Sequence, residues 1–199
     1  MSPVKSDGID RLLPEQRLWT RAEYDRLTEL GLFEDERLEL IEGRIVRKVS
    51  HKSQHATGIR LADKALQTAF PTGYEIRAQL PLALGEYSEP EPDVAVVHGS
   101  TRDYADKHPS TALLVVEVAD SSLNVDRKIK AGLYARCGIQ EYWIVNLVDR
   151  VLEVYREPVA QAEQPLGFHY GRIATLMPDQ SITPLAAPQA VLRVTDLLP

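Results

Sequence analysis

The sequence predicts an α/β fold in which a mixed, twisted β-sheet is flanked by helices. One observation is the almost continuous apolar run Leu113–Val118, typical of a central strand that helices cover on both faces. A second is the polar turn Asp120–Ser122, which supplies helix-capping residues directly before a helix expected over Val125–Cys137. A third is another apolar run, which begins at Asp93. Two apolar strands, the second followed directly by a helix, predict the α/β class.

Length and composition suit a single globular domain, with 199 residues of which 44% are hydrophobic and 26% charged. Residues 1–17 are polar and contain two prolines, so we expect a flexible N-terminal arm there, and one domain over residues 18–199. No apolar run of 18 residues occurs, and the first residues lack the apolar core of a signal peptide. We therefore expect a cytoplasmic protein that does not enter a membrane.

Several patterns place elements in the first half of the chain. Thr20 with Glu23 forms a capping box that starts a helix, which Gly31 ends. A short helix or turn is expected over Glu34–Leu40, and the turn Glu42-Gly43 leads into a strand over Arg44–Val49. An amphipathic helix is expected over His51–Phe70. A strand over Tyr74–Leu84 is expected to pair antiparallel with the strand that follows Asp93, and a loop with one helical turn is expected over Gly99–Thr111.

Two strands over Glu141–Leu147 and Val151–Arg156 are predicted to form a hairpin joined by Val148–Arg150. Residues 158–199 contain six prolines and short apolar runs, so we expect peripheral strands and a short final turn there.

Glu117 is an anomaly, because it places a lone carboxylate inside an apolar strand. A buried carboxylate is so costly that it is normally paired, protonated or bound to a metal. The helix that follows places Asp126, Lys130 and Tyr134 four residues apart on one stripe, so it offers a lysine. If the strand after Asp93 is a neighbour, Asp93 and Glu117 converge.

An ordered set of motifs resembles the Uma2 family of endonucleases, within the PD-(D/E)xK nuclease-like superfamily. The set consists of Pro92-Asp93, the stretch from Glu117 to Ser122, then Asp126, Lys130 and Tyr134, and finally the stretch from Gly138 to Trp143; upstream it includes Leu38 to Gly43. The resemblance covers roughly residues 18–158. It implies a restriction-endonuclease-like fold and a nuclease that cleaves DNA with Mg²⁺, for which Mn²⁺ can substitute.

The resemblance also implies metal ligands, namely the carboxylates of Asp93 and Glu117 and the backbone carbonyl of Val118. Glu39 matches the family's first acidic position and could hold a second metal or its water. Mg²⁺ prefers a few carboxylate oxygens and retains waters, so these residue types suit it. The alternative is structural: Asp93 caps a strand, and Glu117 pairs with a lysine.

The superfamily's usual lysine position, two residues after the glutamate, is occupied here by Ala119. Lys130 takes the relocated position, where it would orient the attacking water and stabilise developing charge. Lys128 is the rival lysine and a possible substrate contact, but it lies off the stripe. Lys130 could instead be a surface lysine that pairs with Asp126.

Supporting roles fall to residues around this set. Gln79, Asp126 and Tyr134 would orient Asp93 and Lys130, although core packing explains Tyr134 equally well. His55 matches a histidine common in the family and could contact phosphate or cap the helix; His51 competes with it.

The formal net charge of −6 argues against a protein that coats nucleic acid, but leaves room for a focused site. The second hypothesis is a catalytically silent nuclease fold that binds nucleic acid or protein, which Asn146 favours because relatives often carry an acid there. An enzyme that cuts both strands needs two sites, so we expect a homodimer, with Leu185–Leu198 contributing to its interface.

Overall fold

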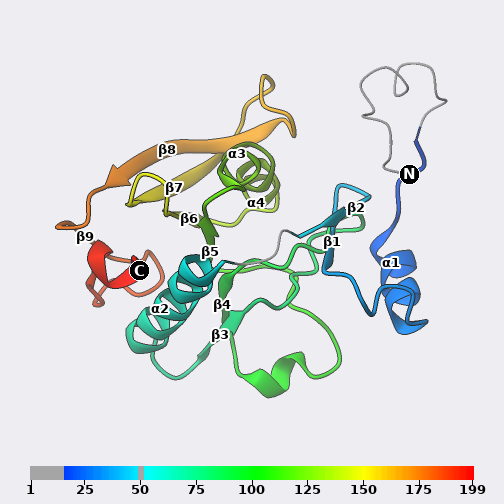
Figure 1. The fold of residues 1–199 in the computed structure, drawn as a ribbon, viewed down its shortest axis with the longest axis horizontal. Coiled ribbons are helices and arrows are strands. Elements are labelled where there is room, and N and C mark those ends of the chain that lie inside the picture. Colours follow the sequence, from blue (N-terminus) through cyan, green and yellow to red (C-terminus); the bar gives the residue numbers. More distant parts are fainter. Residues whose placement is uncertain (1–15, 49–51) are drawn as a thin grey trace.

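The computed structural model describes residues 16–48 and 52–199. Its centre is a six-stranded mixed sheet in the order β3-β4-β5-β6-β7-β8, in which β5 and β6 are parallel and every other neighbouring pair is antiparallel (Figure 1). The strands span Tyr74–Ala78, Val94–His98, Leu114–Ala119, Glu141–Asn146, Val151–Ala160 and Phe168–Leu176. The predicted mixed sheet is confirmed. Most of the expected N-terminal arm, residues 1–15, lies outside the described residues.

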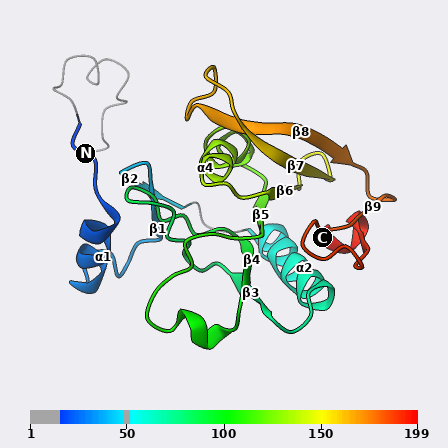
Figure 2. The same ribbon diagram turned by 180° about the vertical axis from the view of Figure 1, so that it is seen from behind.

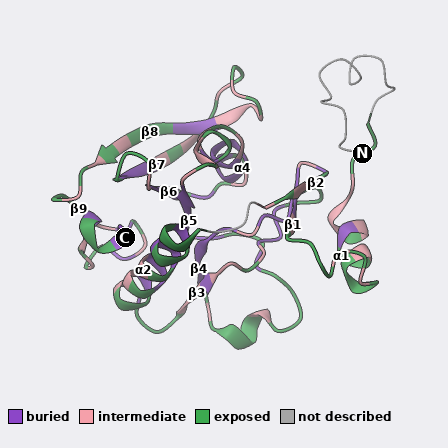
Figure 3. Ribbon diagram, in the orientation of Figure 1, coloured by how far each residue is buried: buried purple, intermediate pink, exposed green. Residues whose placement is uncertain are grey.

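Helices cover both faces of this sheet. The helix α2, Ser53–Ala69, packs on one face together with the C-terminal segment, around Leu66, Val116 and Trp143. A helical stretch over residues 123–136 packs on the other face, around Val115, Leu133 and Tyr142. The two helices lie on opposite sides of β5 in both views (Figures 1 and 2). Every residue of β5 and β6 is therefore buried, as Figure 3 shows, which accounts for their apolar sequences.

The helix over residues 123–136 is not regular. It consists of α3, Leu123–Val125, then a π-helical turn η3, Asp126–Lys130, then α4, Ala131–Arg136. Single π turns inside α-helices occur frequently at functional sites. The sequence predicted one continuous helix over Val125–Cys137, and periodicity alone carries no signal for the extra residue in this turn.

The N-terminal part adds α1, Arg21–Glu29, whose Thr20–Glu23 capping box is confirmed. A two-stranded hairpin follows, with β1 at Leu38–Ile41 and β2 at Arg44–Arg47. The expected helix or turn over Glu34–Leu40 is therefore wrong at its end, where β1 begins. Glu42 and Gly43 both have positive φ, 51° and 72°, which is the backbone that a tight two-residue hairpin turn requires. Pairing with β2 thus decides the conformation of β1.

Two other strand predictions differ from the structure. The strand expected over Tyr74–Leu84 ends at Ala78, because Gln79 turns the chain with φ 55° and Pro81 cannot donate to a ladder. The strand expected over Val151–Arg156 continues to Ala160, because β8 pairs with it along that length. The loop after β4 contains the expected helical turn as η2, Thr101–Tyr104.

The C-terminal region supplies more of the core than peripheral strands would. β8 is a full edge strand of the main sheet; β9, Ser181–Ile182, pairs with β10, Leu192–Arg193, and η4, Val194–Leu197, follows. In the segment Leu185–Leu198, four apolar side chains are buried inside the chain: Ala187, Val194, Leu197 and Leu198. Leu185 and Val191 stay exposed, so only part of this segment is available to a partner.

Candidate active site

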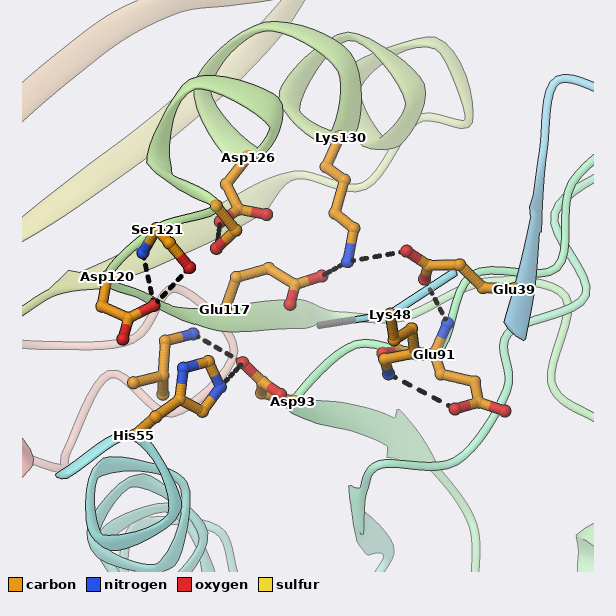
Figure 4. A network of polar contacts seen from close by, with 12 residues as sticks. Glu39, Lys48, His55, Glu91, Asp93, Glu117, Asp120, Ser121, Asp126 and Lys130 are labelled. Carbon is orange, nitrogen blue, oxygen red and sulfur yellow. Dashed lines mark hydrogen bonds and ion pairs between the residues drawn. The ribbon is translucent and has the colours of Figure 1, made fainter. Parts of the chain in front are cut away.

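The register of two strands brings the two predicted acids together. Val94 of β4 lies opposite Val116 of β5, so Asp93 and Glu117, each one position further along, are neighbours across the ladder. Both residues are buried, with 4% and 3% of their surface exposed. The Nζ of Lys130 lies 2.9 Å from the Oε1 of Glu117 (Figure 4). The structure therefore gathers Asp93, Glu117 and Lys130 at one place, although they come from three elements.

Glu39 reaches the same cluster from the β1–β2 hairpin. Its Oε1 lies 3.5 Å from the Nζ of Lys130, and its Oε2 accepts a hydrogen bond of 3.2 Å from the N–H of Glu91. The hairpin is fixed to the end of α4, because Arg136 donates to both carboxylate oxygens of Glu42. This tertiary contact holds Glu39 over the lysine.

Asp93 has two close partners on one of its oxygens. Its Oδ2 accepts a 2.8 Å hydrogen bond from the N–H of Val118 and lies 3.3 Å from the Nε2 of His55, at the start of α2. The backbone carbonyl of Asp93 accepts from the N–H of Gln79 at 3.1 Å. His55 and Gln79 thus both contact Asp93, the former through its side chain and the latter through its backbone.

The remaining predicted residues divide into two that join the cluster and one that does not. Tyr134 is fully buried and donates a 2.8 Å hydrogen bond to the Oε1 of Glu117 rather than to Lys130. Asp126 is buried and accepts a 2.6 Å hydrogen bond from the Oγ of Ser122. Lys128 is exposed and does not line the pocket described below. The expectation that Lys130 could be a surface lysine is wrong, since its side chain is only 8% exposed.

The π-helical turn bears directly on this arrangement. It contains Asp126 and Lys130, both buried toward the cluster, and its outer side is fixed by Arg127. The Nε of Arg127 donates a 3.0 Å hydrogen bond to the Oε2 of Glu153 on β7. The turn that carries the lysine is thereby tied to the sheet.

Burial gives the acids unequal affinities for protons. It raises the pKa of Glu117 to about 8, although the charge of Lys130 opposes the shift. It raises the pKa of Asp126 to about 6, again against Lys130. Burial would also raise the pKa of Asp93, but hydrogen bonds from His55 and from the N–H of Val118 outweigh it and leave that pKa below its ordinary value. Glu117 is therefore the acid that retains a proton near neutral pH.

The two basic groups stay charged more readily than isolated ones. Burial lowers the pKa of Lys130, but the surrounding carboxylates, Glu117 first, outweigh it and hold that pKa well above its usual range. Burial likewise lowers the pKa of His55, yet its contact with Asp93 leaves the pKa raised overall. The cluster thus holds more carboxyl groups than its cations neutralise.

The donor set fits a hard divalent cation. In the part of the chain that the structure describes, no group of three or more His, Cys, Asp and Glu side chains has a geometry that encloses a metal. Mg²⁺ does not need one, because proteins commonly bind it through one or two carboxylates, with waters and substrate phosphates completing the shell. Asp93 and Glu117 are two neighbouring carboxyl groups of the type that such a site uses.

A pocket of about 730 Å³ opens over the cluster. Its floor includes Glu39, Asp93, Glu117 and Lys130, and its walls come from the β1–β2 hairpin, the start of the helix over residues 123–136 and the β7–β8 loop. The buried acids therefore line a concave site.

Comparison with known families decides what kind of protein this is. Residues 21–193 match a family model described as "Uma2: Putative restriction endonuclease". The chain belongs to the Uma2 family. The match extends beyond residue 158 into the C-terminal region, so β8 and most of the segment after it are part of the family's shared sequence.

One solved structure has the same fold as this Uma2 protein. It is described as the crystal structure of a "putative nuclease belonging to DUF820" from Anabaena variabilis ATCC 29413, with a TM-score of 0.62 and 18% sequence identity, over 98% of this chain and 97% of that one. No curated protein matches the sequence. Within the described residues, no helix is long and apolar enough to cross a membrane.

The structure adds pocket residues that the motifs did not single out. The Nζ of Lys48 donates to the backbone carbonyl of Glu91 at 2.7 Å, and Lys48 and Arg44 both line the pocket. Arg44, Val46 and Lys48 are two residues apart, so a strand over Arg44–Arg47 that continues extended to Lys48 places all three on one face. This spacing becomes informative only once β1 and β2 are known to pair.

Asn146, which favoured a silent fold, has a structural explanation. It is fully buried, and its side chain accepts hydrogen bonds of 3.0 Å from the N–H groups of Val148 and Asp149 while donating at 2.8 Å to Glu153. Asn146 therefore caps the turn between β6 and β7 and does not line the pocket.

Proposed function

We propose that this Uma2 protein is a Mg²⁺-dependent endonuclease that hydrolyses phosphodiester bonds in DNA, with Mn²⁺ able to replace Mg²⁺. The observation that carries the proposal is the buried group of Asp93, Glu117 and Lys130 at the floor of one pocket. A structural ion pair would need one acid beside the lysine, but here a surplus of carboxyl groups surrounds it.

Asp93 and Glu117 would hold the metal through carboxylate oxygens, Val118 would add its backbone carbonyl, and Glu39 would bind a second ion or its water. When bound, the metal supplies neutralisation of the scissile phosphate and acidification of a water. Asp93 is prepared for this role, because Val118 and His55 keep its carboxylate ionised and fixed.

Lys130 would orient the attacking water and stabilise the negative charge that develops on the oxygens around phosphorus. Its high pKa keeps it cationic at any working pH, and contacts with Glu117 and Glu39 fix its amine. Such a preorganised cation stabilises charge more effectively than a mobile one. Tyr134 and Asp126 would position Glu117 and Lys130, and Gln79 would hold the backbone of Asp93. His55 would contact the phosphate, and Lys128 would be a further substrate contact from the surface.

Two further proposals concern the protein as a whole. A homodimer would bring two such pockets to the two strands of a duplex, in keeping with the commonest symmetry of small enzymes. The exposed Leu185 and Val191 are the part of the C-terminal segment available for that contact. The cytoplasmic location expected from the sequence stays a prediction.

The test is cleavage of supercoiled plasmid DNA with Mg²⁺, with Mn²⁺ and with EDTA. Wild type should cut with either metal and not with EDTA, whereas Asp93→Ala and Glu117→Ala should be inactive. Asp106→Asn, which changes an exposed carboxylate away from the pocket, should cut like wild type.

The competing hypothesis is a silent nuclease fold that binds nucleic acid or protein. It is favoured if wild type cuts no DNA with either metal and calorimetry detects no Mg²⁺ binding. Binding of Mg²⁺ without cleavage would retain the metal site and reject the enzyme.

A further inference from the structure

The pocket above the acids has walls that phosphodiester chemistry alone does not explain. Phosphate groups and metal ions need polar and charged partners, yet many apolar residues line the cavity, among them Leu18, Ile41, Val46, Val125, Ile129 and Leu166. Leu18 and Val125 are 47% and 51% exposed. Apolar side chains that stay half exposed beside a buried acid cluster indicate a surface that a ligand covers.

Four separate segments build these walls. Leu18 precedes α1 and packs on Gly43, where a Cβ would lie only 2.6 Å from the Cβ of Leu18. Val125 and Ile129 come from α3 and the π-helical turn, and Leu166 comes from the loop between β7 and β8. The backbone N–H of Trp19 donates to the carbonyl of Gly43 at 2.9 Å, which fixes the Leu18 segment on the hairpin. The apolar walls are thus a defined feature of the fold.

The size of the cavity suits one nucleotide. Pockets of about 300–1,000 Å³ enclose compact organic ligands, and this one measures about 730 Å³. A base within an intact duplex is stacked on both faces, so it cannot lie against such a wall unless it is unpaired or turned out of the helix. An unpaired nucleotide, in contrast, presents an apolar ring face together with a charged phosphate.

A cation for the neighbouring phosphate stands at the rim. Arg44 is exposed and lines the pocket, and among the residues that the structure describes it has no acidic partner. Its neighbour Arg47 is paired with Glu36, and Lys52 lies 3.6 Å from Asp120. Arg44 is therefore the rim cation most readily available to a backbone phosphate.

We propose that the pocket accepts an unpaired nucleotide of a DNA strand, with the base against the apolar walls, the scissile phosphate over the acids and a flanking phosphate on Arg44. This substrate class rests on the proposed nuclease function. The site accordingly acts on single strands, or on duplexes at positions where a base is unpaired.

The experiment compares three fluorescent oligonucleotides of one sequence: a single strand, its perfect duplex, and the single strand with one nucleotide made abasic. The abasic strand keeps every phosphate and loses one base, so it isolates the base contact from charge. Binding is measured by anisotropy with Ca²⁺, a hard cation that carboxylate oxygens also bind, and cleavage is measured with Mg²⁺. We expect the single strand to bind and react at least about tenfold better than the duplex. When the abasic site falls at the nucleotide that enters the pocket, the affinity of the strand should fall about tenfold.

The matched variants are a pocket pair, Leu18→Ser with Val125→Ser, and a control pair, Val148→Ser with Ile173→Ser, of similar exposure but outside the pocket. The pocket pair should bind the normal strand about as weakly as the abasic strand. The control pair should keep the difference in affinity between the two strands that the wild type shows. Arg44→Gln should weaken the normal and abasic strands equally and reduce the salt dependence of binding.

The possible results separate this inference from the proposed function. If duplex and single strand are bound and cut equally and the abasic change has no effect, the inference is wrong and the nuclease stands. If the base preference appears in binding but no metal supports cleavage, the nuclease is wrong and the pocket is not a substrate site. A single-stranded RNA of the same sequence is measured alongside, and the assignment to DNA is overturned if the RNA is bound and cut better than the DNA strand.

Discussion

Replacing Glu117 with glutamine should make the metal-free protein more stable at alkaline pH while it abolishes cleavage. The amide has nearly the shape of a protonated carboxyl, so it can still accept the hydrogen bonds that Lys130 and Tyr134 donate to Oε1. It cannot become negative beside Asp93, Asp126 and Glu39. The sign of the stability change therefore distinguishes an acid gathered for a metal from one that simply pairs with a lysine.

The magnitude follows from the pKa of Glu117, which burial raises to about 8 from an ordinary value of 4.5. Between these values the folded protein holds a proton that the unfolded chain releases, so the free energy of unfolding falls as pH rises through this window. Each pKa unit is worth about 1.4 kcal/mol. Because neighbouring acids such as Asp126 readjust their own protonation, we expect the variant to gain about 2–4 kcal/mol at pH 8.5 and less than about 1 kcal/mol at pH 5.

The assay is urea unfolding in EDTA at both pH values, with Glu141→Gln as the matched control. Glu141 is fully buried on the adjacent strand; its Oε1 accepts from Arg156 and Trp143, and its Oε2 accepts a 2.7 Å hydrogen bond from the N–H of Leu185. A glutamine has only one accepting oxygen, because its other terminal atom is an NH₂ donor. The free energy of unfolding of the control should therefore fall by about 2–5 kcal/mol. If Glu117→Gln is destabilised like the control at pH 8.5, Glu117 is a structural partner of Lys130 and our reasoning fails.

Three other predictions concern turnover, pH and assembly. Lys130→Ala should slow single-turnover cleavage by about 10²–10³ without changing calorimetric Mg²⁺ affinity more than a few fold. Lys128→Ala should keep its turnover and bind DNA more weakly and with a smaller salt dependence, because it makes one phosphate contact fewer. The reverse pattern would make Lys128 the functional lysine. Burial raises the pKa of Glu89 to about 7, so the free energy of unfolding falls as pH rises from about 4.5 to 7. Thermal unfolding should therefore show that Glu89→Gln increases this free energy by on the order of 1 kcal/mol at pH 8 and by almost nothing at pH 4.5. Light scattering at micromolar concentration should give twice the chain mass of 22.3 kDa. A mass equal to that of one chain would contradict the proposed homodimer.

The meeting of the two acids with the lysine could be predicted from the sequence because each step is local. A lone carboxylate in an apolar strand needs a partner, adjacent strands place residues at the same height, and helical spacing returns Lys130 to the stripe of Asp126 and Tyr134. Since these signals depend on strand and helix periods, they remain valid although the helix contains a π turn. The roles of these residues in catalysis stay predictions.

The rest of the site depends on tertiary contacts that no local pattern encodes. Glu39 reaches Lys130 because β1 pairs with β2 and Arg136 binds Glu42, residues 94 positions apart in sequence. The early end of β3 depends on a positive φ at Gln79, a backbone state uncommon for residues other than glycine. The C-terminal segment looked like an interface because its apolar residues are obvious in sequence, whereas their burial against the chain's own core is not.

The central claim is a divalent metal held between Asp93 and Glu117. Its most direct test is a crystal of the wild-type protein soaked in Mn²⁺ and measured for anomalous scattering. We predict one strong peak at about 2–2.5 Å from an oxygen of each carboxylate, with the Nζ of Lys130 close by but not coordinated. Crystals that stay well ordered in Mn²⁺ and show no peak between the two acids would contradict the account.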